Sequence, residues 1–210
     1  MSYGFLDIAI TPGVRAVQAQ MGADQLWQDF KGQRDFDRFG AQEAAFIAER
    51  DSFYLATVSE TGWPYVQHRG GPRGFLTLLD ERTLAFADYR GNRQYLTLGN
   101  LAANDRTCLF LMDYPRRTRM KLYMRAEAVA LDADPALTER VCAAGGRGRP
   151  ERMIRLHLQS FDWNCPQHIT PRFSEPEISE AIRPLHEQLA RLEDENRALR
   201  AQLAQRGHAP

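Results

Sequence analysis

The sequence has few cysteines and no long apolar run, and each scarcity excludes a class of protein. Cys108, Cys142 and Cys165 lie far apart in 210 residues and form no C-x-x-C pair. This dispersed, odd set argues against a disulfide framework or a zinc site and favours a reducing compartment. No apolar run approaches the roughly 18 residues of a membrane span, and the N-terminus lacks the pattern of a signal peptide. We therefore expect a cytoplasmic protein with no membrane partner.

An excess of either charge is also lacking. The 27 basic and 27 acidic residues balance, so no global field points to nucleic acid. The five histidines show no metal-ligand spacing. Neither a G-x-S-x-G nucleophile motif, nor a Walker A loop, nor an H-E-x-x-H helix occurs. These absences favour an organic cofactor over a side-chain nucleophile or a metal, and they leave the catalytic residues unknown.

What is present from Ser52 onward is a series of β-rich runs separated by turn signals. The first two runs flank Glu60-Thr61-Gly62, which predicts a hairpin. At least six antiparallel strands in this region predict a mainly β fold, a small closed barrel with peripheral helices. The further expected strands are residues 75–79, 83–87, 107–113, 119–132 and 152–164.

Helical patterns are predicted before, within and after the barrel. Apolar spacing favours a short helix at 41–51, and Asp134-Pro135 opens another that runs to about residue 143. The expected domains are an N-terminal helical arm at 1–40, a barrel at 41–172 and a C-terminal coiled-coil helix at 176–206.

The coiled-coil prediction rests on apolar residues that alternate between spacings of four and three. With Asn196 at an a position and Glu195 able to reach Arg200 of a partner helix, the pattern favours a parallel homodimer. The alternative is an amphipathic helix packed on its own barrel, which uses a wider apolar stripe. A DNA-binding zipper is excluded because no dense basic segment precedes the repeat. The repeat comprises Ile178, Ile182, Leu185, Leu189, Leu192, Asn196, Leu199 and Leu203.

A small polar turn after the fourth predicted strand could bind phosphate. Asn92 is a good helix N-cap, and Arg93, Gln94 and Tyr95 would be the first helical residues. Free N–H groups, the helix dipole and the Arg93 fork together suit an anion. The alternative is an ordinary turn and cap.

Three further polar clusters are open to two interpretations each. Arg69, after Gln67 and His68, could meet the same anion as Arg93, or the cluster could be a plain strand end. Arg119 could point inward from a basic hairpin tip that is otherwise solvated. The third of these clusters could offer a ligand an aromatic wall and several hydrogen-bond donors, or its Trp could simply cap the last strand. Its members are Trp163, Asn164, Gln167 and His168.

Residues 50–130 resemble the pyridoxamine 5′-phosphate oxidase-like, FMN-binding split-barrel family. The resemblance is carried by collinear features: an "ATV…G.PY" hairpin, a strand ending in a turn with "NRQ", a helix ending near "NDR", a buried strand, and then "AE". "FDWNCPQHITPRF" is similar to the C-terminal signature of a subgroup. The resemblance implies a split β-barrel that forms homodimers with FMN in the dimer cleft.

The resemblance also implies where FMN binds. The family usually has Arg-Lys in the phosphate turn, so Gln94 removes one cation, and we expect Arg69 to compensate for it. Arg119 falls where the oxidase has a Gln that faces the flavin ring. The implied cofactor-binding residues are Gln67, His68, Arg69, Ala87, Asp88, Asn92, Arg93, Gln94, Arg119, Trp163, Gln167 and His168.

The substrate site of the true oxidase does not carry over. Its Lys-Tyr-Arg-Ser set, which holds a substrate phosphate, falls on Pro72, Leu137, Val141 and Gly145. We therefore expect an FMN-dependent oxidoreductase that acts on a different small molecule. The alternative is a flavin- or haem-binding module without turnover. His68 and His168 are the acid–base candidates by their ordinary pKa range.

Overall fold

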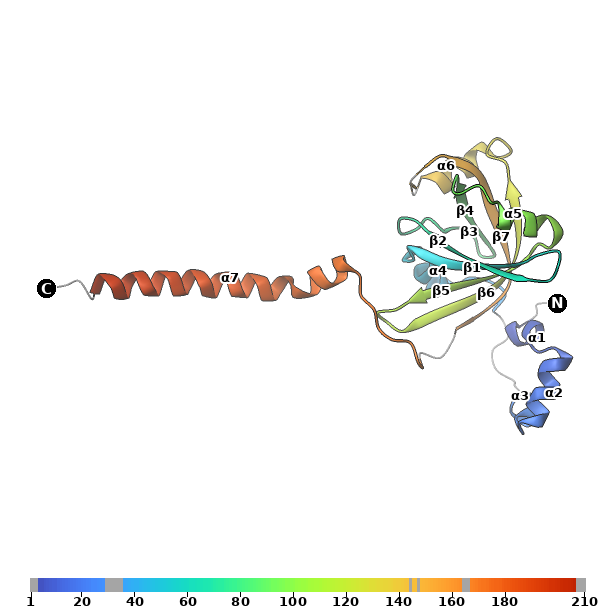
Figure 1. Ribbon diagram of the computed structural model, residues 1–210, viewed down its shortest axis with the longest axis horizontal. Helices are drawn as coiled ribbons and strands as arrows, with labels where there is room; N and C mark the ends of the chain where they lie inside the picture. The colour runs from blue at the N-terminus through green and yellow to red at the C-terminus, as the bar shows by residue number, and fades with distance from the viewer. Residues whose placement is uncertain (1–3, 29–35, 144, 147, 164–166, 207–210) are drawn as a thin grey trace. The chain divides into compact units, whose positions relative to one another are not determined.

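The computed structural model describes residues 4–28, 36–143, 145–146, 148–163 and 167–206 (Figure 1). Part of the predicted arm and Asn164 lie outside the described residues. The chain divides into two compact units, Met1–Ile169 and Thr170–Pro210. The first contains the sheet and the short helices, and the second contains one long helix.

Seven antiparallel strands make one curved sheet in the order β2-β1-β5-β6-β7-β4-β3 (Figure 1). The predicted hairpin joins the first two strands, and Gly62 takes the left-handed conformation in its loop, with φ at +84°. The strands are β1 (Ser52–Val58), β2 (Pro64–Gly70), β3 (Thr77–Asp80), β4 (Thr83–Tyr89), β5 (Arg106–Asp113), β6 (Thr118–Val129) and β7 (Pro150–Trp163).

The barrel is split rather than closed by backbone hydrogen bonds, which corrects the expectation of a closed barrel. The strand order begins at β2 and ends at β3, and among the described residues no ladder joins these two edges. Side chains of β2, β4 and helix α5 (Leu96–Ala103) meet in the gap instead. A mainly antiparallel sheet with this gap is consistent with a split barrel.

The inner face of the sheet is apolar because strand residues alternate between its two faces. In β1, Phe53 and Leu55 are buried, whereas Tyr54 between them is exposed. The Phe53 ring stacks on Phe75 and meets Phe86 edge-on, with ring centroids 5.5 and 5.4 Å apart. These offset and edge contacts are the favourable aromatic geometries, so they anchor the core under the functional region.

Short helices flank the sheet where the apolar spacing predicted them. The predicted helix at 41–51 ends earlier, at Ala48, and the predicted helix after Asp134 begins at Pro135, with Asp134 as its N-cap. Three helices fall in the expected N-terminal arm. These elements are α1 (Phe5–Ala9), α2 (Pro12–Gln20), α3 (Asp24–Gln28), α4 (Ala41–Ala48) and α6 (Pro135–Cys142).

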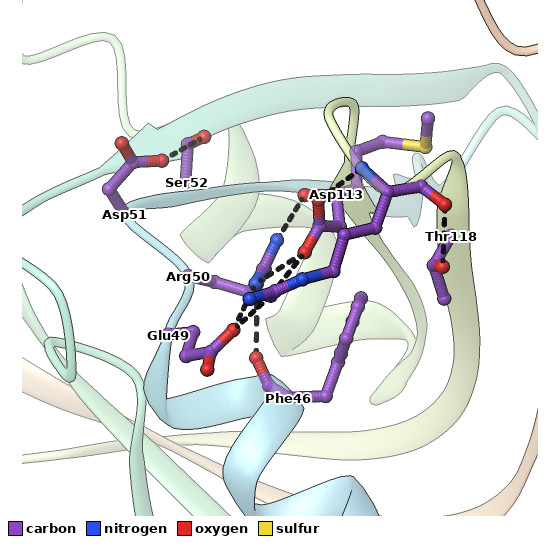
Figure 2. A network of polar contacts seen from close by, with 9 residues as sticks. Phe46, Glu49, Arg50, Asp51, Ser52, Asp113 and Thr118 are labelled. Atoms are coloured by element: carbon purple, nitrogen blue, oxygen red, sulfur yellow. Dashed lines mark hydrogen bonds and ion pairs between the residues drawn. The ribbon is translucent and has the colours of Figure 1, made fainter. Parts of the chain in front are cut away.

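A buried arginine fixes the end of α4 to the β5–β6 hairpin, as Figure 2 shows. Arg50 donates from Nε to the Phe46 carbonyl at 3.0 Å and from Nη1 to the Met112 carbonyl at 3.0 Å. Its Nη2 lies 2.9 Å from Asp113 Oδ2, and Arg116 contacts the same carboxylate. Since every nitrogen of this guanidinium has a partner, the burial of its charge is compensated.

The second unit contains α7 (Glu175–Arg206), a single helix with Pro184 inside it. The coiled-coil pairing of this helix stays a prediction. In the part of the chain that the structure describes, no helix is both long and apolar enough to cross a membrane.

Candidate functional site

Two arginines hold one carboxylate at the gap in the barrel. Arg69 on β2 donates from Nη1 to Asp88 Oδ1 at 2.7 Å, and Arg152 on β7 donates from Nη1 to Asp88 Oδ2 at 2.8 Å. Asp88 is buried, and both guanidinium groups are largely buried. The ladder between β4 and β7 places Arg152 directly opposite Asp88. Arg152 also contacts Glu151 Oε2 at 3.3 Å, so two carboxylates balance the two guanidinium charges of this cluster.

Helix α5 is fixed across the same gap by two side-chain hydrogen bonds. Thr97 donates to the Gln67 side chain at 2.8 Å, and Asn100 donates to the Thr57 hydroxyl at 2.9 Å. Both polar residues of α5 are buried, so these bonds satisfy groups that water does not reach. They hold the N-terminal end of α5 beside β2, and the polar turn precedes this end in the chain.

The polar turn differs from the prediction in one respect. Asn92 is not the N-cap of α5, because the helix begins at Leu96 and Tyr95 takes the cap position. The Asn92 side chain accepts a hydrogen bond from the Gln94 backbone N–H at 3.1 Å, which closes a local turn before the helix starts. Arg93 and Tyr95 have φ values of +66° and +51°, which interrupt any helix at these positions.

Left-handed backbone at two large residues has a functional implication. Such conformations are uncommon outside glycine, and they cluster at ligand clamps and active sites, where surrounding structure compensates for the strain. Arg93 is exposed, so its side chain is held at the surface by the turn and not by packing. The turn therefore presents a cation at a fixed place on the rim of the site.

A pocket of about 270 Å³ lies between this turn and β2, β4 and α5. It brings together two strands and the turn, which are distant in the sequence. Six residues predicted to bind the cofactor line it: Gln67, Arg69, Asp88, Asn92, Arg93 and Gln94.

A larger pocket of about 690 Å³ shares Arg69 and Tyr89 with the smaller one. The predicted residues His68 and Ala87 lie in its lining. Aromatic rings and glycine backbone make up much of the remaining wall. The additional lining residues include Phe75, Phe86, Gly70, Gly71, Gly145 and Gly146.

The two pockets differ in the chemistry of their walls. The smaller one is lined by Arg69 and Arg93 together with Asp88 and Glu151, and the larger one has apolar and aromatic walls. The Nε atom of Arg69 is buried and has no hydrogen-bond partner among the residues that the structure describes. A buried donor without a partner is rare and points to a ligand or water at this place.

Tyr89 contributes a neutral polar group where the pockets meet. Burial raises the pKa of its phenol above the ordinary value of 10.0, and the Cys142 thiol adds to the rise. The phenol therefore stays protonated at neutral pH and can donate a hydrogen bond. Gly146 lies against this ring so closely that a Cβ there would come within 2.3 Å of the ring carbon Cζ.

Four predicted residues do not join these pockets within one chain. The Trp163 indole donates to Glu43 at 2.9 Å and packs edge-on against Phe46, so it anchors α4. It lies eleven residues along β7 from Arg152, about 36 Å for an extended strand. Arg119 lies on the outer sheet face beside Met112, and its Nε is buried without a partner. Gln167 and His168 are exposed beyond β7.

The positions that hold substrate phosphate in the true oxidase have different surroundings in this chain. Pro72 and Gly145 line the larger pocket. Val141 and Leu137 instead pack in an apolar cluster with Met153, on the side of α6 that faces the sheet. None of the four supplies a cation.

Sequence reasoning missed Arg152, Tyr89 and the Gly146 contact. Arg152 begins a strand that reads as an ordinary amphipathic run, and only the β4–β7 register reveals its partner. Its guanidinium also lies 5.3 Å from the centre of the Tyr95 ring. A single Arg at the start of a predicted strand does not by itself mark Arg152 as a functional residue. Among the described residues, no group of His, Cys, Asp or Glu is arranged to hold a metal ion.

Solved structures similar to this chain share little of its sequence. The HupZ protein of Group A Streptococcus is 17% identical, covers 64% of this chain and 100% of its own, and gives a TM-score of 0.49. An FMN-binding protein of Syntrophomonas wolfei is 10% identical, with coverages of 73% and 95% and a TM-score of 0.47. By themselves these likenesses support no functional conclusion.

Comparison with family descriptions is more informative. No curated protein matches the chain. The family model described as pyridoxamine 5′-phosphate oxidase matches residues 39–160, which include every strand of the sheet except the end of β7. This span is more than half of the 210 residues. The chain therefore belongs to the pyridoxamine 5′-phosphate oxidase family.

Proposed function

We propose that this chain is an FMN-dependent oxidoreductase that acts on a small molecule as a homodimer. The observation that carries the proposal is the pair of joined pockets that share Arg69, one lined mainly by polar and charged side chains and one with apolar and aromatic walls. Membership in a flavin-binding, oxidoreductase-type family supports the same reading. When bound, FMN would supply the redox chemistry, and the protein would bind and orient it.

The residues have distinct roles in this proposal. Arg93 would pair with the phosphate at the rim of the smaller pocket, because a guanidinium matches phosphate oxygens in charge and shape. Arg69 would donate from its free Nε while Asp88 fixes its orientation. Ala87 and the Phe86 ring would form the wall beside the flavin ring. The neutral Tyr89 phenol would be a donor toward ligand or substrate.

An apolar outer sheet face supports the homodimer. Tyr54, Val58 and Val66 point away from the core and are 38%, 37% and 59% exposed. The strand registers place Cys108 and Phe110 of β5 on the same face. Contiguous exposed apolar surface of this kind marks an association site.

Association through this face also gives Arg119 a role. The pocket residue His68 on β2 and Lys121 on β6 are three strands apart on this face, which is about 14 Å. Arg119 lies two residues from Lys121 on the same strand and face, so it does not line the pockets of its own chain. In a face-to-face dimer, Arg119 would approach the pockets of the second copy. Its unpartnered Nε is consistent with a contact that one chain alone does not provide.

The substrate is proposed to differ from that of the true oxidase. Two of the four phosphate-binding positions are core residues here, Leu137 and Val141, and Pro72 and Gly145 supply no charge to the pocket wall. A small molecule with a planar or apolar group would fit this wall better than a phosphate ester.

The test is to purify the full chain, release any bound cofactor and identify it by absorbance and mass. FMN, or uptake of added FMN with tighter binding than riboflavin, is the expected result. Haem instead of flavin, or no uptake of FMN, would overturn the proposal. Reduction of the bound flavin by a nicotinamide donor, followed by turnover with an acceptor, would distinguish an enzyme from a carrier.

A further inference from the structure

Helix α7 exposes an apolar stripe along its length that one polar residue, Asn196, interrupts. The apolar side chains of this stripe recur at spacings of four and three residues, and all are between 38% and 68% exposed. The remaining faces are charged, polar or alanine. The apolar stripe consists of Ile178, Ile182, Leu185, Leu189, Leu192, Leu199 and Leu203.

We propose that α7 pairs with α7 of a second copy of this chain, parallel and in register, as a two-stranded coiled coil. The proposal goes beyond the proposed function, because it concerns a unit outside the cofactor site. A strict a/d stripe is the narrow seam of a coiled coil, whereas a helix that packs on a globular surface uses a wider one. Within the described residues of the second unit, nothing covers this stripe.

Asn196 identifies the partner as an identical helix. It occupies an a position in the middle of the stripe, where Ile182, Leu189 and Leu203 occupy the other a positions. In a parallel pair in register, each Asn196 faces its copy, and the two amides can bond to each other. In a shifted or antiparallel pair, each amide would face leucine and be buried without a partner, which is unfavourable.

Charge complementarity supports the same arrangement. Glu195 lies at a g position, and Arg200 lies five residues later at an e position. In a parallel dimer these two positions on opposite helices are neighbours, so the pair is attractive on both sides of the seam. The ion pairs that α7 makes within itself, Glu180 with Arg183 and Asp194 with Arg197, lie on outward positions and leave the seam free.

Pro184 indicates which part of the coiled coil is the most stable. A proline inside a helix removes the hydrogen bond to the carbonyl four residues earlier, which is that of Glu180. Pro184 faces outward between the seam residues Ile182 and Leu185, so it weakens the helix there without blocking the interface. The pairing is therefore expected to hold most firmly from Leu185 to Leu203.

A seam of this length is marginal in isolation, because short helices form weakly in water. A second contact between the same two chains would make the pairing intramolecular, with an effective concentration on the order of millimolar. The apolar face of the barrel is the candidate for that contact, so the experiments below use the full chain.

The first experiment tests register and direction. Asn196→Cys is compared with Ala198→Cys, an outward position two residues away, under mild oxidation. A parallel pair brings the two 196 positions within disulfide range, so an interchain bond should form about tenfold faster than at 198. Mass spectrometry of the linked peptides separates this bond from those of the native cysteines. Equal rates, or no 196–196 bond, would overturn the proposal.

The second experiment tests the seam with matched charges. Leu192→Asp puts a carboxylate in the seam, and Ala190→Asp puts the same group on an outward position. The seam variant should lose helicity and, combined with Asn196→Cys, lose the 196–196 bond, whereas Ala190→Asp should retain both. Identical behaviour of the two variants would refute the coil. Flavin uptake should be unchanged in both, so loss of the coil and failure of the FMN proposal are distinguishable.

Discussion

Asp88 Oδ1 accepts a hydrogen bond from Arg69 Nη1 at 2.7 Å, across the gap between β2 and β4. This ion pair, with Arg152 on the other oxygen, connects β2 to β4, and among the described residues no backbone ladder joins these two strands. It also fixes the side chain that both pockets share. Stability of the barrel and geometry of the site therefore depend on the same carboxylate.

Removing this carboxylate should destabilise the fold. Asp88→Ala leaves the largely buried Arg69 guanidinium without its anion and leaves Arg152 with Glu151 alone, which should reduce the free energy of unfolding by about 3–5 kcal/mol. Urea denaturation of the full chain measures the change. The exposed Asp132→Ala is the control, expected to alter stability by less than about 0.5 kcal/mol. Equal stability of the two variants would show that the cluster does not hold the gap.

Arg93→Ala should weaken FMN binding by about 1.5–3 kcal/mol, the range for a hydrogen bond to a charged group. Riboflavin, which has no phosphate, should bind the variant and the parent equally. Arg106→Ala removes an exposed arginine at the start of β5 and is the matched control. Fluorescence quenching of each flavin measures the affinities. An unchanged FMN affinity would show that Arg93 does not contact the phosphate and that the turn is an ordinary loop.

Gln94→Lys should strengthen FMN binding modestly, because it places a second cation beside Arg93 in this turn. The gain should be about 0.2–1 kcal/mol, since position 94 is exposed. It should shrink as salt rises, because exposed charges are screened. The change also removes the bond between the Asn92 and Gln94 side chains, so Gln94→Met separates the two effects. A gain with Met as large as with Lys would contradict the charge explanation.

Stability at low pH should depend on Asp113. Burial raises the pKa of this carboxyl, but hydrogen bonds and charge from Arg116 and Arg50 outweigh it, and the net pKa is lowered. The unfolded chain therefore binds the proton first, below about pH 4. The stabilisation is present above that value and is lost as pH falls through the folded-state pKa.

The measurement is the free energy of unfolding at several pH values between neutral and 3. Asp113→Asn should be less stable than the parent at neutral pH and should lose less stability on acidification. Asp51→Asn, an exposed carboxyl, should retain the slope of the parent. A parental slope in Asp113→Asn would mean that other carboxyls govern acid unfolding.

Gly146→Ala should distort the larger pocket. A Cβ at this position overlaps the Tyr89 ring, so either the loop or the ring must move. Overpacking of this kind costs about 1–3 kcal/mol, and flavin affinity should fall. Gly91→Ala is the control, because a Cβ there has open space although Gly91 lines the smaller pocket. Equal flavin affinity in the two variants would exclude Gly146 from the site.

Much of the fold could be predicted from the sequence, because it follows from local signals. The Glu60-Thr61-Gly62 hairpin and the cap at Asp134 depend on residues close in the chain, and both are confirmed. The cap at Asn92 was wrong, because its side chain bonds within the turn and Arg93 takes a left-handed conformation. A helix cap and a closed local turn at Asn92 are similar in energy, and residue propensity alone does not choose between them.

By itself, the sequence determined the order of strands and helices, the polar turn and the heptad pattern of the last helix. These features follow from the identity of the turn residues and from the spacing of apolar residues, which is two in strands and three to four in helices. Only the tertiary structure decided that Arg69, Asp88 and Arg152 form one cluster, and that the Trp163 indole anchors α4 through Glu43. Such contacts depend on strand register and on the gap between β2 and β4. They join residues that are far apart in the chain, so the local conformational preference of one residue does not predict its contact with the other.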